Sequence, residues 1–245
     1  MKNIIIVFAG FLLLLTGCKR DEYYKDGGRA QADYPGDMLQ YLQDKAVPFD
    51  TIAQIVKLAG MEDMFRKSDF TFFAPDDDVI KRTIGNNKTK GSLNKFLFDY
   101  GRDTVKKLSD IDSSIWRKYL QRYMFKGVNR LKDYSQIDLT LQNQYPGALY
   151  YSYSGDVLNI GVIYGDANNV KYIGPRTLVI GYIYDINNAD NAIFRTMVSS
   201  SDIKPKNGVV HTLQYNGAYF GFYPSDFYPT DFYLEIYFAG LHPSN

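Results

Sequence analysis

The stretch at residues 207–213, Asn-Gly-Val-Val-His-Thr-Leu, constrains the fold more than any other part of the chain. Asn207 and Gly208 both tolerate positive φ angles, so the chain can reverse direction there at little steric cost. Val209 and Val210 are consecutive β-branched residues, which favours a strand that is covered on both faces. His211 then places a polar ring in this apolar setting, where the ring needs hydrogen-bond partners. The stretch therefore predicts a tight turn that leads into a buried strand.

A second stretch, Phe-Thr-Phe-Phe-Ala-Pro-Asp, occupies residues 70–76. Together the two stretches resemble the opening and closing motifs of the fasciclin domain, and the resemblance covers residues 37–214. The residues that carry it, and to which it assigns a structural role, are Phe70, Thr71, Ala74 and Pro75 in the opening motif and Asn207, Gly208, Val210 and His211 in the closing motif. The resemblance implies an α+β fold, in which a wedge of two β-sheets has flanking α-helices, and a function in adhesion or binding. It implies no particular ligand.

The composition is that of a globular protein with a core, since 45% of the 245 residues are hydrophobic and 22% are charged. The formal net charge of +1 gives no electrostatic reason to expect a nucleic-acid partner. Aromatic residues reach 16%, with 22 Tyr and 16 Phe but one Trp, which indicates strand-rich structure and amphipathic surfaces. The chain contains one cysteine, so an intramolecular disulfide is excluded.

The N-terminus has the pattern of a targeting segment. A short basic start precedes an apolar run, Ile4 to Leu15, that is short for a membrane span and fits the core of a signal peptide. Leu15-Thr16-Gly17-Cys18 resembles the bacterial lipobox. That resemblance implies cleavage after residue 17 and acylation of Cys18 with palmitate-type chains. We expect no cofactor besides this covalent lipid. The alternative is an ordinary secretory signal that contains a cysteine by chance.

Residues 18–36 are polar and lack an apolar period, which predicts a lipidated flexible tether with an r.m.s. reach of roughly 20–25 Å. The charged cluster Lys19-Arg20-Asp21-Glu22 is similar to the export signals of Gram-negative lipoproteins that are displayed on the outer face. We therefore expect a location on the outer membrane facing the cell surface, with the periplasmic leaflet as the alternative.

Residues 37–215 are predicted to form the fasciclin-like domain. Asp50 is expected to cap a helix that continues to Ala59, and Asp76 to cap another through Thr83. The three carboxylates of residues 76–78 could be read as a metal site, but consecutive acids on a helix point in different directions. No metal is therefore predicted.

A further helix is expected from Ser114 to Met124. Fasciclin domains typically carry a Tyr-His pair at the end of this segment, and here Arg122 and Tyr123 stand in its place. The absent histidine puts adhesion chemistry assigned to that pair in doubt. Tyr123 is left as a candidate partner of His211.

From residue 137 the pattern changes to strands separated by turn residues. The candidate strands are 137–142, 148–153, 157–163, 177–185 and 192–198.

Residues 216–245 form an aromatic-rich extension that we expect to be β-structured and packed on the domain. A Phe-Tyr-Pro-Ser/Thr-Asp repeat spans residues 222–231, and residues 233–238 alternate as a final strand would. Tyr223, Tyr228 and Tyr233 are the candidates for contact with a ligand or partner, because an exposed tyrosine can stack while its hydroxyl stays hydrogen-bonded. The alternative is that these rings extend the core.

No catalytic motif stands out in the sequence: we find no nucleophile elbow, no His-Glu-x-x-His and no Gly-rich phosphate loop. His211 is more simply explained as a hydrogen-bonded core residue than as a base. We therefore predict a non-catalytic, surface-tethered lipoprotein that binds a protein or glycan/matrix partner. The alternatives are an accessory subunit of an outer-membrane transporter that imports glycan or peptide, and a surface hydrolase.

Overall fold

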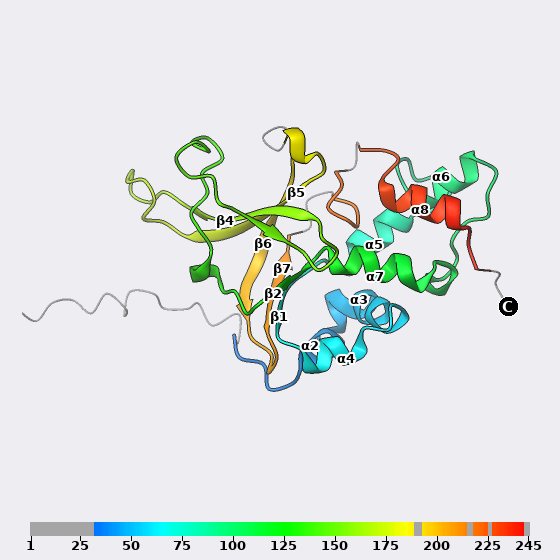
Figure 1. Cartoon of the computed structure of the whole chain (residues 1–245), viewed down its shortest axis with the longest axis horizontal. Coiled ribbons are helices and arrows are strands. Elements are labelled where there is room, and N and C mark those ends of the chain that lie inside the picture. Colours follow the sequence, from blue (N-terminus) through cyan, green and yellow to red (C-terminus); the bar gives the residue numbers. More distant parts are fainter. Residues whose placement is uncertain (1–31, 189–192, 215–217, 225–226, 243–245) are drawn as a thin grey trace, which may run out of the picture. The chain divides into compact units, whose positions relative to one another are not determined.

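The computed structural model describes residues 32–188, 193–214, 218–224 and 227–242. The predicted signal peptide, Cys18 and most of the predicted tether lie outside the described residues. Residues 32–245 cluster as one compact unit (Figure 1).

The helices precede, interrupt and follow the strands. The α-helices are α2 (Met38–Asp44), α3 (Ala46–Leu58), α4 (Glu62–Lys67), α5 (Asp77–Ile84), α6 (Leu93–Asp99), α7 (Ser113–Gln121) and α8 (Asp231–Ala239). Short 3-10 turns are η3 (Leu108–Asp110), η4 (Leu131–Asp133) and η5 (Ile186–Asn188). The strands are β1 (Phe70–Ala74), β2 (Met124–Lys126), β3 (Ala148–Tyr151), β4 (Val157–Tyr164), β5 (Arg176–Ile183), β6 (Ile193–Ile203) and β7 (Val209–Leu213).

Within the described part of the chain the strands join in the order β2-β1-β7-β6-β5-β4-β3, and of these neighbouring strands only β1 and β7 run parallel. Strand β6 pairs with β5 through its first half and with β7 through its second half, and the register shifts twice between Val198 and Ile203. Such shifts bend a strand. The predicted α+β class is confirmed, and the two expected sheets are joined through β6.

The two ends of this strand order also meet. The backbone N–H of Tyr153, just after β3, donates to the carbonyl of Met124 in β2 at 2.9 Å, and Phe125 forms a bridge with Ser152. This closure covers backbone groups that an open sheet would leave unpaired. The predicted strand at 137–142 is wrong, because that segment is a turn held by Asp138, whose carboxylate accepts from the N–H of Thr140 and Leu141.

Two predicted helix caps have different outcomes. Asp76 caps α5 as expected, accepting the N–H of Val79 at 2.9 Å. Asp50 is not the cap of α3. Its neighbours Thr51 and Ile52 donate their N–H groups instead to Asp77, at 2.8 and 3.4 Å. The first acid of α5 therefore binds α3 across the fold, which explains why Asp77 is buried.

The expected β-structured extension at residues 216–245 is wrong, because residues 231–239 form helix α8. Thr230 caps it by accepting the N–H of Tyr233 at 3.3 Å. Phe232, Tyr233 and Ile236 are buried at helical spacing. Residues 233–238 alternate between Tyr or Glu and Leu, Ile or Phe, as the two faces of a strand would, and this alternation led to the wrong prediction.

Candidate functional site

The two fasciclin-type stretches come together at the centre of the sheet. Strands β1 and β7 pair in parallel with Thr71 opposite Val209, Phe72 opposite Val210 and Phe73 opposite His211. The motif residues Phe70, Thr71, Ala74, Asn207, Val210 and His211 are buried, as is Pro75. The junction is therefore part of the core and offers no open surface for a ligand.

Asn207 fixes the turn that precedes β7. Its side-chain oxygen accepts the N–H of Met38 at 2.8 Å, and its amide nitrogen donates to the carbonyls of Phe65 and Ser68 at 2.9 and 3.0 Å. One side chain thus joins α2, the end of α4 and the turn. Gly208 has a φ of +80° and lies against the backbone of Phe70.

His211 and Thr71 hold the connection between β2 and η4. The hydroxyl of Thr71 donates to the Gly127 carbonyl at 2.8 Å and accepts the N–H of Asn129 at 2.9 Å. His211 Nδ1 accepts the N–H of Asp202 at 3.2 Å, so Nε2 carries the proton and donates to the Asn129 carbonyl at 3.0 Å. Both ring nitrogens are used by backbone groups, which supports the prediction that His211 is a core residue.

Burial lowers the pKa of His211 below its ordinary value of 6.5, and this outweighs the opposite effects of the Asn129 carbonyl and Asp202. Unfolding exposes the ring and restores its pKa, so the unfolded chain binds the extra proton. The stabilising contribution of neutral His211 is complete above pH 6.5 and is lost as the pH falls below that value.

We therefore expect the free energy of unfolding to fall between pH 7.5 and 5.5, with a slope that approaches about 1.4 kcal/mol per pH unit. Urea unfolding followed by the fluorescence of buried Trp116 measures this slope. The change His211→Gln should remove most of it, whereas His242→Asn, at the exposed second histidine, should preserve it. An unchanged slope in His211→Gln would contradict the assignment.

The residues at the position of the Tyr-His pair are also structural. The hydroxyl of Tyr123 accepts the N–H of Gly221 at 2.7 Å, and its ring stacks on Phe222 with centroids 4.3 Å apart. The expectation that Tyr123 partners His211 is wrong, because Gly221 in the C-terminal segment takes its hydroxyl.

Arg122 is buried and spans three parts of the chain. Its Nε donates to Asp156 at 2.9 Å, and one terminal nitrogen donates to the Gly221 carbonyl at 3.1 Å and to the Tyr223 hydroxyl at 3.0 Å. The guanidinium carbon lies 4.2 Å from the ring centroid of Tyr182. Sequence reasoning missed this centre, because an arginine next to an aromatic residue is not by itself a signal of burial.

Two of the three tyrosines predicted to contact a ligand are core residues. Tyr223 is 1% exposed and Tyr233 0%, so the prediction is wrong for both. The Tyr233 hydroxyl shares its proton between the carbonyls of Thr83 and Gly91, at 3.2 and 3.0 Å, which ties α8 to the end of α5 and to the loop before α6. Tyr228 is 42% exposed and remains available on the surface. Its surroundings on α6 and α8 carry exposed rings that sequence reasoning did not select.

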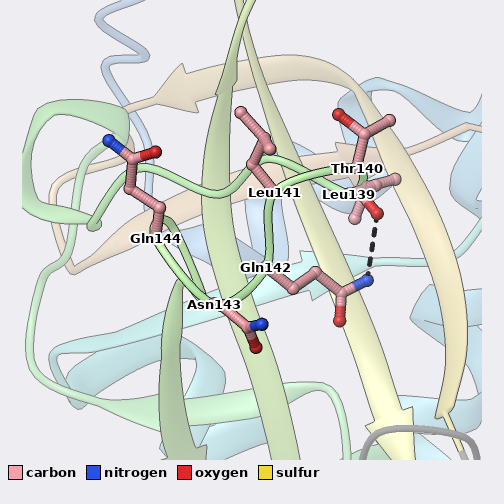
Figure 2. A pocket seen from close by; sticks show the side chains of 6 residues that line it. All are labelled: Leu139, Thr140, Leu141, Gln142, Asn143 and Gln144. Carbon is pink, nitrogen blue, oxygen red and sulfur yellow. Dashed lines mark hydrogen bonds between the residues drawn. The ribbon is translucent and has the colours of Figure 1, made fainter.

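A hollow of about 480 Å³ lies in the turn before β3 and is lined by residues 139–144 (Figure 2). Figure 2 shows the side chains spread around one arched loop, which is braced by a 3.2 Å hydrogen bond from the Gln142 side chain to the Leu139 carbonyl. The lining residues carry amide, hydroxyl and leucine side chains and no ionisable group. The hollow therefore suits contact with a partner better than acid–base chemistry.

A second loop, residues 165–175 between β4 and β5, packs beside this turn. The Tyr172 hydroxyl donates to Asp138 at 2.9 Å, and the Tyr172 and Tyr145 rings lie 5.4 Å apart. Hydrogen bonds from Thr140, then from Tyr172, lower the pKa of Asp138 to about 2. Exposed Leu139, Leu141, Val170 and Ile173 line this loop pair, defined here as residues 138–145 and 165–175.

Among the described residues, no group of three or more His, Cys, Asp or Glu side chains is arranged to hold a metal ion. Within the same residues, no helix combines the length and the apolar character needed to cross a membrane.

Comparison with known proteins gives partial similarity to solved structures. No protein-family model matches the sequence, and no curated protein matches it. The structure is similar to a FAS1 domain pair from the insect cell adhesion molecule fasciclin I, with 19% identity and a TM-score of 0.44. The match covers 74% of this chain and 50% of that chain, so the chain spans about half the length of this neighbour. A likeness at this level assigns neither a family nor a function.

Proposed function

We propose that the chain is a non-catalytic binding module, lipid-anchored at Cys18 and displayed on the outer membrane, that attaches to a protein or matrix partner. The observation that carries this proposal is the parallel pairing of the two fasciclin-type motifs in β1 and β7. The anchor rests on the lipobox-like residues 15–18. The backbone hydrogen bonds of both His211 ring nitrogens support a structural rather than a catalytic use of that residue.

The loop pair is the surface that we assign to the partner. It combines the hollow of residues 139–144 with exposed Leu141 and Ile173. Apolar side chains on loops held by a firm scaffold are a common arrangement for recognition. The Asp138–Tyr172 hydrogen bond holds the two loops together before any partner arrives, which lowers the entropic cost of binding.

A mild-detergent pull-down of the full-length protein from its native outer membrane, followed by mass spectrometry, tests this function. We expect a specific partner whose recovery falls at least about tenfold in Leu141→Asp and Ile173→Asp, because the introduced charge is desolvated at the contact. Val128→Asp, at an exposed residue outside the loop pair, is the matched control and should retain the partner.

Two other outcomes would contradict the proposal. Stoichiometric recovery of an outer-membrane transporter barrel, insensitive to both loop changes, would favour an accessory subunit of a glycan or peptide importer. Turnover of a soluble substrate that disappears on a single Asp or Glu change would favour a hydrolase.

A further inference from the structure

Three aromatic rings of the outer surface pack against buried Phe96 where α6 and α8 meet, and a fourth packs against one of the three. The Phe96 ring centroid lies 4.9 Å from that of Tyr100, 5.8 Å from Tyr228 and 5.8 Å from Tyr237, and Tyr237 lies 5.3 Å from Phe238. We call Tyr100, Tyr228, Tyr237 and Phe238 the α6–α8 face. Its rings come from three separate parts of the chain: the end of α6, the residues before α8, and α8 itself.

The outer rings of this face are exposed to solvent. Phe238 is 78% exposed and Tyr100 61%. Helix α8 buries Phe232, Tyr233 and Ile236, whereas Phe238 lies on its outer side together with the acids Asp231 and Glu235. The exposed aromatic area of the face therefore comes mainly from Phe238 and Tyr100.

The charge beside the face indicates what covers it. The exposed guanidinium of Arg102 lies over Tyr237, with its carbon 4.7 Å from the ring centroid. Tyrosine and phenylalanine rings with an arginine at their rim match the composition of surfaces at a membrane–water boundary. At such a boundary the rings sit at headgroup level and the cation reaches phosphate.

Chain length places such a boundary within reach, given the lipid anchor proposed above. Thirteen residues, 19–31, separate Cys18 from the described domain and can span at most about 45 Å. A globular domain of residues 32–245 has a radius of gyration of about 17 Å and so a width of roughly 45 Å. The domain therefore stays within about its own width of the membrane, and a face with exposed aromatic rings gains free energy by resting there.

We propose that the α6–α8 face lies on the phospholipid headgroup layer of the anchoring membrane, with its rings at the acyl boundary and Arg102 among the phosphates. This inference rests on the proposed lipid anchor. The contact orients the domain, whereas the acyl chains hold it. Helices α6 and α8 lie away from β4 and β5 (Figure 1), so a domain in this orientation presents the β4–β5 loop to the outside.

Site-specific quenching in vesicles tests the proposal. Acylated Cys18 is the only native cysteine, so Phe238→Cys supplies a single free thiol for a fluorescent nitrobenzoxadiazole label. The full-length lipoprotein is reconstituted into phosphatidylethanolamine/phosphatidylglycerol vesicles with and without spin-labelled lipid. We expect quenching at residue 238 to exceed that at the control Val170→Cys, an exposed residue of the loop pair, by about fivefold. Adding Tyr100→Asp should reduce the quenching at residue 238 to the control level.

Equal quenching at residues 238 and 170 would overturn the proposal. So would crosslinking between residue-238 thiols of two copies in detergent without quenching by lipid, which would make the face a dimer contact. The intact mass separately reports whether Cys18 is acylated. If it is not, the proposed anchor fails, and flotation of the unacylated protein with the same vesicles, with and without Tyr100→Asp, still decides the role of the face.

Discussion

Replacing Gly208 by alanine is expected to destabilise the domain by at least about 3 kcal/mol, because two independent costs add. At φ +80° the backbone is left-handed, a conformation that costs a residue with a Cβ about 1–2 kcal/mol. The new Cβ would also lie 2.1 Å from the carbonyl oxygen of Phe70, well inside contact distance. That oxygen belongs to β1 and cannot move without disturbing the parallel pairing with β7.

Gly155→Ala is the matched control for this change. Gly155 has a φ of +86°, yet a Cβ there would meet nothing within 4 Å. It therefore isolates the backbone cost, and we expect a loss of about 1–2 kcal/mol. Urea unfolding followed by Trp116 fluorescence measures both variants. Equal losses at the two glycines would show that the close approach of β7 to Phe70 is not the constraint.

Removal of the Arg122 side chain is expected to cost about 3–5 kcal/mol, the range for breaking a buried ion pair by deleting one partner. The side chain of Arg122 is 3% exposed and that of Asp156 is 22% exposed, so residual solvation of the carboxylate favours the lower end. Arg122→Ala also leaves the Gly221 carbonyl without the guanidinium and empties the space beside Tyr119 and Tyr182.

A double variant separates the contribution of the ion pair from that of side-chain packing. Arg122→Met with Asp156→Asn fills the volume and removes both charges, so it should recover more than half of the loss seen in Arg122→Ala. Arg117→Ala, at an exposed arginine of α7, the helix that Arg122 follows, should stay within about 1 kcal/mol of the parent. A large loss in Arg117→Ala, or a negligible one in Arg122→Ala, would contradict the assigned role of Arg122.

Local signals predicted the parts of the fold that depend on near neighbours. The Asp76 cap acts through the N–H of Val79 three residues on, and the turn at Asn207–Gly208 needs only a permissive backbone. Strands β4, β5 and β7 were predicted for the same reason, since apolar runs between turn residues indicate strands directly. In the candidate site, His211 was correctly predicted as a hydrogen-bonded core residue.

Predictions failed where the deciding partner lies far along the chain. Tyr223 and Tyr233 have the composition of surface recognition residues, but Arg122 binds the hydroxyl of the first and the carbonyls of Thr83 and Gly91 accept from the second. The predicted cap Asp50 failed in the same way, because Asp77 accepts the N–H groups of Thr51 and Ile52, which lie 26 and 25 residues before it. The residue pattern within either segment does not predict such long-range contacts.

The sequence by itself determined the turn before β7, the buried strand that follows this turn and the cap of α5, because each follows from the φ preferences, hydrogen-bonding groups and apolar spacing of consecutive residues. The α+β class was implied by the resemblance of the two motifs. Only the tertiary structure decided that the C-terminal segment is a helix whose inner rings complete the core, that Arg122 is enclosed, and that the α6–α8 face stays exposed. An aromatic side chain gains free energy by burial wherever a complementary surface exists, and the sequence does not say which rings will find one.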